Sequence, residues 1–206
     1  MKGNHNELSI TTNLSDSYKI LDGEKKVMIS APHCVEQTRN GHIKLAEPQT
    51  LYIANELHTS LSCPIIYKTA NCNDDANYDT ECAYKSVLAD YIKTHNIRWL
   101  LDLHQMASHR ENDIDLGTGR GKNFTDTEAL KTISDIFKSF EIQNVVYDHL
   151  FSASYPFTVS SYISRSCKIQ CLQIEINSSI VYNTDSIGIQ RIINSLKDIV
   201  IYLNQR

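Results

Sequence analysis

The chain has 206 residues, of which 41% are hydrophobic and 21% are charged. A chain of this length buries enough apolar surface to fold without disulfide or metal staples, so any bound metal is expected to serve chemistry. The 20 Lys and Arg residues against 24 Asp and Glu give a formal net charge of −4. This balance lacks the basic surplus that phosphate neutralisation needs, which argues against a nucleic-acid-binding protein.

The compartment and the number of domains follow from segments that the sequence lacks. The longest apolar run, at 199–203, is far shorter than the about 20 residues that span a bilayer. The N-terminal residues carry no apolar stretch of the kind found in secretory signals. Without an export signal the six cysteines are expected to be reduced. We therefore expect a cytoplasmic chain that binds no membrane and forms one domain over residues 1–206, with its oligomeric state left open.

Short apolar runs alternate along the chain with longer segments in which apolar residues recur three and four apart, a pattern typical of α/β folds. In chain order, the sequence predicts these elements: 27–30 (strand), 48–61 (helix), 65–67 (strand), 84–92 (helix), 98–103 (strand), 114–116 (strand), 125–140 (helix), 145–147 (strand), a short helix ending at 165, 169–176 (strand) and 185–206 (helix). The order favours a three-layer α/β/α fold with a mixed, mostly parallel central sheet.

Polar residues with metal-binding chemistry lie at or near the ends of three predicted strands. His33 and Glu36 follow the first strand, His104 follows the strand at 98–103, and Glu175 interrupts the apolar strand at 169–176. Ligands of open α/β sheets gather beyond the carboxyl ends of the strands. Catalytic zinc takes three imidazole or carboxylate ligands and keeps a fourth position for water.

The pattern therefore predicts one zinc ion per chain, bound by His33, Glu36 and His104. Glu175 is then expected to act as the general base, because an activated water needs a proton acceptor beside it. Asp102 lies two residues before His104 and on the same side of that strand. It is expected to orient the imidazole of His104 through a hydrogen bond.

Four segments of the chain resemble the N-formylglutamate amidohydrolase family: residues 31–36 (APHCVE), 39–47 (RNGHIKLAE), 101–104 (LDLH) and 172–177 (LQIEIN). The family is a branch of the zinc carboxypeptidase-like superfamily, which also includes succinylglutamate desuccinylase and aspartoacylase. The resemblance covers about residues 25 to 180. It implies a phosphorylase/hydrolase-like fold, one zinc ion, and hydrolysis of an amide bond next to a carboxylate-bearing amino acid.

The same resemblance points to a substrate-binding position. Asn77 stands where the superfamily has the first residue of an Asn-Arg pair that grips the substrate carboxylate, but Tyr78 replaces the Arg. An anionic substrate still needs a guanidinium, which binds a carboxylate bidentately. Arg39, close to the metal loop, and Arg120, among glycines, are the candidates for holding the substrate or stabilising an oxyanion. Arg165 is a further substrate-binding candidate.

The sequence thus predicts a zinc-dependent hydrolase that cleaves an amide bond of a small N-acyl amino acid or a short peptide. A zinc carboxypeptidase or a poly-glutamate or peptide hydrolase would use the same site, so these alternatives stay open. Two readings of other classes also stay open. One is a cysteine hydrolase with Cys34 as the nucleophile. The other is a non-catalytic metal- or ligand-binding module, which the departure at Tyr78 suggests.

Overall fold

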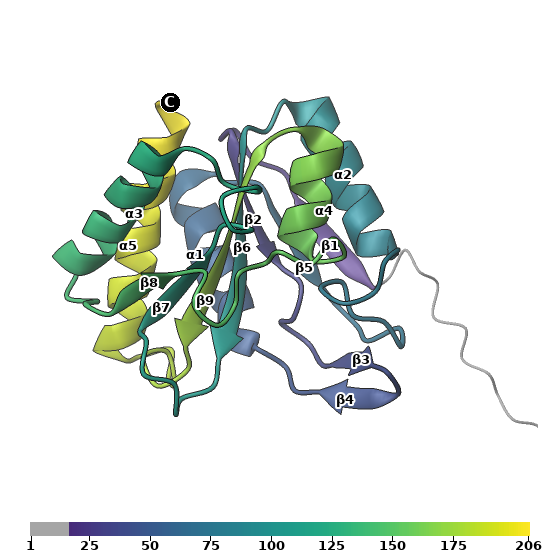
Figure 1. Ribbon diagram of the computed structural model, residues 1–206, viewed down its shortest axis with the longest axis horizontal. Helices are drawn as coiled ribbons and strands as arrows, with labels where there is room; N and C mark the ends of the chain where they lie inside the picture. The colour runs from purple at the N-terminus through teal and green to yellow at the C-terminus, as the bar shows by residue number, and fades with distance from the viewer. Residues whose placement is uncertain (1–16) are drawn as a thin grey trace, which may run out of the picture.

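A computed structural model describes residues 17–206 of the protein (Figure 1). Its centre is a seven-stranded sheet with the strand order β1-β5-β2-β6-β9-β7-β8. The strands of this sheet are β1 (Tyr18–Leu21), β2 (Val27–Ala31), β5 (Ile65–Lys68), β6 (Trp99–Met106), β7 (Ile114–Gly117), β8 (Val145–Tyr147) and β9 (Gln170–Asn177). A separate two-stranded hairpin pairs β3 (Gln37–Arg39) with β4 (His42–Lys44).

The pairing within the sheet is mixed and mostly parallel, as the sequence predicts. β2 runs parallel to β5 and β6, β6 runs parallel to β9, and β7 runs parallel to β8. The antiparallel pairs are β1 with β5 and β7 with β9. The central strands β5, β2, β6 and β9 therefore all end at the same edge of the sheet.

Helices cover both faces of the sheet and complete the predicted three layers (Figure 1). The helices are α1 (Pro48–Leu61), α2 (Ala83–His95), α3 (Thr127–Ser139), α4 (Val159–Cys167) and α5 (Ile187–Asn204). Buried residues of α1, α3 and α5 form one core with one face of the strands, and those of α2 and α4 form the second core with the other face. No helix within residues 17–206 is both long enough and apolar enough to cross a membrane.

Helix starts follow local chemistry. Pro48 begins α1, where its missing N–H costs no hydrogen bond. The pattern Thr125 to Glu128 predicts a start at Thr125, but α3 begins at Thr127 because the Asp126 carboxylate caps it, accepting from the N–H of Ala129 at 2.9 Å. β1 and the β3–β4 hairpin are not predicted from the sequence, because they are short and carry few buried apolar residues.

The central strands contribute fully buried apolar side chains to both cores. Leu101 lies in the middle of β6 and is 0% exposed. Replacing Leu101 with Ala is expected to lower the free energy of unfolding by about 2–5 kcal/mol, because it removes buried methyl groups and leaves a cavity. The control is Ile201→Ala on the outer face of α5, where 43% exposure predicts a change within about 0.5 kcal/mol. Urea unfolding of both variants measures the difference, and equal losses would contradict this assignment of the core.

Candidate active site

Four polar side chains share one face of the sheet on neighbouring strands. The parallel register of β6 and β9 sets His104 beside Glu175 and Asp102 beside Gln173. Successive strand side chains point to opposite faces, so the apolar residues between them, such as Leu103, enter the core under α1, α3 and α5. The four polar groups therefore lie on the opposite face of the sheet. This is the face whose earlier residues, such as Leu100 and Cys171, pack against α2 and α4.

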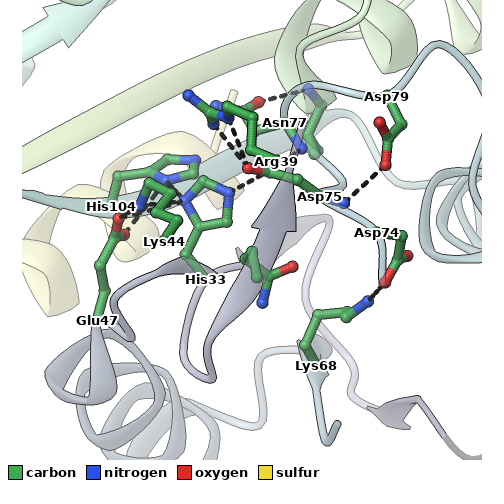
Figure 2. Close-up of polar contacts among 12 residues, drawn as sticks. His33, Arg39, Lys44, Glu47, Lys68, Asp74, Asp75, Asn77, Asp79 and His104 are labelled. Carbon is green, nitrogen blue, oxygen red and sulfur yellow. Dashed lines mark hydrogen bonds and ion pairs between the residues drawn. The ribbon is translucent and has the colours of Figure 1, made fainter. Parts of the chain in front are cut away.

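Two histidines and a glutamate converge at the carboxyl edge of the sheet (Figure 2). His33 follows β2, His104 lies near the end of β6, and Glu47 is the N-cap residue of α1. His33 Nδ1 lies 3.1 Å from His104 Nδ1 and 3.2 Å from Glu47 Oε1, and His104 Nδ1 lies 3.4 Å from Glu47 Oε2. Tetrahedral bonds of about 2.0–2.1 Å to zinc separate ligand atoms by about 3.3 Å. The spacing of the two Nδ1 atoms from each other and from the Glu47 carboxylate therefore fits a zinc ion.

The outer nitrogens of both imidazoles contact buried carboxylates. His33 Nε2 lies 2.8 Å from Asp75 Oδ1, and His104 Nε2 lies 3.3 Å from Asp102 Oδ2. An Nε2–H that donates to a carboxylate leaves Nδ1 of a neutral imidazole as an acceptor. Two such acceptors facing each other repel unless a proton or a metal ion lies between them. The donor set thus fits a metal ion in chemistry as well as in spacing.

Charges of both signs surround the cluster. Burial alone would lower the pKa of His104, but the carboxylates of Asp102 and Glu47 outweigh it and raise that pKa well above its ordinary value. Burial alone would raise the pKa of Glu47, but His33 and His104 hold it well below its ordinary value. Lys44 adds a positive charge, with Nζ paired to Glu47 and 3.1 Å from His33 Nδ1.

The carboxylate in the cluster is not the one that the sequence predicts as a ligand. Glu36 is exposed and lies outside the cluster, and Glu47 stands in its place. The chain leaves His33 through the β3–β4 hairpin and then returns, so that the N–H of Glu47 donates to the carbonyl oxygen of His33 at 2.8 Å. The sequence signal was a carboxylate at the end of segment 39–47, one residue before the helix start. The backbone N–H of Gln105 holds this carboxylate at 3.0 Å.

Glu175 lines the same cavity as the cluster, a hollow of about 410 Å³. Its side chain is almost fully buried, and its Oε1 accepts a hydrogen bond from Gln173 Nε2 at 3.0 Å. Burial raises the pKa of Glu175 to about 8, because the nearby His104 compensates only in part. A carboxyl with such a pKa is suited to both accepting and releasing a proton near neutral pH.

Two of the other predicted residues also line the cavity. Arg39 binds Asp75 Oδ2 through Nε at 2.9 Å and Nη2 at 2.7 Å, and so braces the carboxylate that contacts His33 (Figure 2). Asn77 Nδ2 donates to Gln173 Oε1 at 3.3 Å, while its Oδ1 accepts from the N–H of Val159 at 2.8 Å. Asn77 therefore connects the loop before α2 with β9 and the start of α4.

Arg120 and Arg165 are not among the residues that line this cavity. Arg120 is exposed in a tight turn with φ 56°. Arg165 is exposed on α4, where its guanidinium donates to the carbonyl oxygens of Ser161 and Pro156. Neither guanidinium is in a position to meet a substrate beside the His-Glu-His cluster.

Cys34 has none of the features of a nucleophile. The thiol is buried, and its Sγ donates to the carbonyl oxygen of Lys68 at 3.0 Å. Burial raises the pKa of this thiol to about 11, so the thiolate that attacks carbonyl groups is scarce at neutral pH. The adjacent His33 directs both ring nitrogens to carboxylates instead. The geometry therefore argues against a cysteine hydrolase.

The sequence matches no known protein-family profile and no curated protein. Among solved structures, it is similar to N-formylglutamate amidohydrolase from Ralstonia eutropha JMP134, with a TM-score of 0.61 and 11% identity over 92% of this chain and 97% of that one. A bacteriophage poly-gamma-glutamate hydrolase gives a TM-score of 0.59 and 13% identity over 92% and 91% of the two chains. For N-acetylmuramoyl-L-alanine amidase from Clostridium difficile 630, the TM-score is 0.52 and the identity is 14% over 87% of this chain and 97% of that one. At these identities, the likeness shows a shared fold, the one that the sequence resemblance implies.

The two candidate acidic ligands can be separated by mutation. Glu47→Gln removes the charged ligand and is expected to weaken zinc binding at least about tenfold, as loss of one protein ligand or its partner commonly does. Glu36→Gln is the matched control and is expected to bind zinc as the unaltered protein does, because Glu36 is exposed outside the cluster. Isothermal titration with zinc measures both affinities. Loss of binding in Glu36→Gln with retention in Glu47→Gln would reverse the assignment.

Proposed function

We propose that the protein is a zinc-dependent hydrolase that cleaves an amide bond of an N-acyl amino acid or a short peptide. The observation that carries the proposal is the convergence of His33, Glu47 and His104 on one point beside Glu175 in a single cavity. The shared fold gives support, since the similar structures are named as an amidohydrolase, a hydrolase and an amidase.

The residues of the cluster have separate roles in this proposal. The metal would be held by Nδ1 of His33, Nδ1 of His104 and a carboxylate oxygen of Glu47. A divalent metal ion in such a site polarises a carbonyl group and lowers the pKa of water. Glu175 would accept the proton of the attacking water and deliver it to the departing amine. The 3.0 Å hydrogen bond from Gln173 Nε2 to Glu175 Oε1 would position the Glu175 side chain for these proton transfers.

Two carboxylates would act on the imidazoles as positioning residues. Asp102 and Asp75 accept from the outer nitrogens of His104 and His33, which fixes each ring and keeps Nδ1 free to bind. Arg39 braces Asp75 and has N–H groups beyond the two that this carboxylate uses. We assign these further N–H groups, with the amide of Asn77, to the α-carboxylate of the substrate.

A carboxypeptidase or a poly-glutamate hydrolase would use the same metal ligands and the same base. The substrate class is therefore decided by rates on N-acyl amino acids compared with rates on short α-linked and γ-linked peptides. A binding module without catalysis would bind zinc and hydrolyse neither class. The cytoplasmic location and the single-domain organisation stay predictions from the sequence.

The role of Glu175 gives a direct test of catalysis. Glu175→Gln is expected to lower kcat about 100- to 10,000-fold, because the neutral amide cannot take the proton of water. Zinc content should stay at the level of the unaltered protein, since Glu175 is not part of the His-Glu-His cluster. Hydrolysis of N-formyl and N-acetyl amino acids, together with metal analysis, measures both quantities. Undiminished activity in this variant would remove Glu175 as the base.

A further inference from the structure

Part of the cavity wall is aromatic and has no role in the chemistry assigned so far. We call Tyr78, Tyr155 and Phe157 the aromatic wall; all three line the cavity that holds the His-Glu-His cluster. The rings of Tyr155 and Phe157 stack with centroids 5.3 Å apart and planes 6° apart. Phe157 also contacts Tyr78 at a centroid distance of 5.6 Å and a tilt of 58°. The three rings therefore form one continuous apolar surface.

The aromatic wall reaches the metal cluster through Arg39. The guanidinium carbon of Arg39 lies 4.9 Å from the centre of the Tyr78 ring. The same guanidinium binds Asp75, and Asp75 contacts His33. A continuous series of contacts thus runs from Tyr155 through Phe157, Tyr78 and Arg39 to the residues that support a metal ligand.

Buried polar contacts hold the aromatic wall in place. The side chain of Lys85 is fully buried, and its ammonium donates to the carbonyl oxygen of Phe157 at 2.7 Å and to that of Asp79. One ammonium therefore ties together the two loops that carry Tyr78 and Phe157. Asn77 adds a second tie by accepting from the N–H of Val159 at 2.8 Å. A wall fixed before binding loses little conformational entropy when a ligand stacks on it.

Charge on the cavity lining argues against an acidic side chain in the substrate. The lysine and arginine residues that line the cavity are Arg39 and Lys44. Lys44 is paired with Glu47, and Arg39 is paired with Asp75 and has its further N–H groups assigned to the α-carboxylate of the substrate, so neither is left for a second carboxylate. The other residues that line the cavity include the apolar Leu150 and Phe151. Tyr155 is 66% exposed although it stacks on Phe157, so most of its surface is free for a further contact.

We propose that the aromatic wall is the subsite that selects the substrate, and that it takes an aromatic side chain of the N-acyl amino acid in preference to an acidic one. This inference depends on the proposed function, because it names the substrate class of the same site. The aromatic ring of the substrate would extend the stack of Tyr155 and Phe157 while the amide bond lies at the cluster. Specificity is then set by dispersion and burial of apolar surface instead of charge pairing.

The test compares hydrolysis of N-acetyl-L-phenylalanine, N-acetyl-L-alanine and N-acetyl-L-glutamate. The unaltered protein is expected to show the highest kcat/KM on the phenylalanine derivative. Tyr155→Ala should lower kcat/KM on that substrate about tenfold and on the alanine derivative less than about twofold, because only the aromatic substrate loses a stacked partner. Tyr155→Phe keeps the ring and should restore the rate.

Tyr182→Ala is the matched control, since Tyr182 is also strongly exposed, at 72%, but does not line the cavity. It should leave all three rates unchanged. The proposal is overturned if the glutamate derivative is the preferred substrate, or if Tyr155→Ala lowers the rates on all three equally.

Calorimetric binding separates this proposal from the proposed function. The Glu175→Gln protein, loaded with zinc, is titrated with the phenylalanine and glutamate derivatives, with and without Tyr155→Ala. The aromatic subsite is supported if the phenylalanine derivative binds more tightly than the glutamate derivative and if Tyr155→Ala abolishes this difference in affinity. This holds even if the unaltered protein hydrolyses none of the three. Equal binding of both derivatives overturns the subsite and leaves the hydrolase proposal to the activity measurements.

Discussion

Two imidazole nitrogens that face each other at 3.1 Å, with a carboxylate beside both, are the constraint on which the site depends. When both imidazoles are neutral, such an arrangement is unfavourable without positive charge, because Asp75 and Asp102 engage the outer nitrogens and the inner ones are left as acceptors. Lys44 supplies part of that charge. A divalent cation would supply more, which supports the proposed metal site.

The sheet fixes the positions of the buried polar groups in the site. His104 and Glu175 pair in register on β6 and β9, so their separation is set by the sheet and not by a mobile loop. The faces of the same strands that point away from them carry leucine and isoleucine and belong to the core under α1, α3 and α5. Rigid strands therefore fix the proposed base relative to one ligand, while the loop after β2 and the start of α1 bring the other two.

Apolar periodicity was enough to predict the layers, the parallel central strands and the positions of His33, His104 and Glu175, because each of these lies at or near the end of a buried strand. The acidic ligand was not predictable in the same way. Glu36 has attractive spacing from His33 but lies on an exposed stretch, whereas Glu47 reaches the cluster only because the hairpin folds the chain back. Arg120 was a candidate for substrate binding because it lies among glycines, but it does not line the cavity. Which loop faces the cavity is decided by tertiary packing.

In the proposed site, the inner nitrogens of His33 and His104 and the carboxylate of Glu47 bind one metal ion. Diffraction at the zinc absorption edge, from crystals of the protein grown with zinc, tests this ligand set. We expect one anomalous peak within bonding distance of His33 Nδ1, His104 Nδ1 and a Glu47 oxygen, with Asp75 and Asp102 still on the outer nitrogens. A zinc ion bound through Nε2 of either histidine, or bound at Glu36 instead of Glu47, would rule it out.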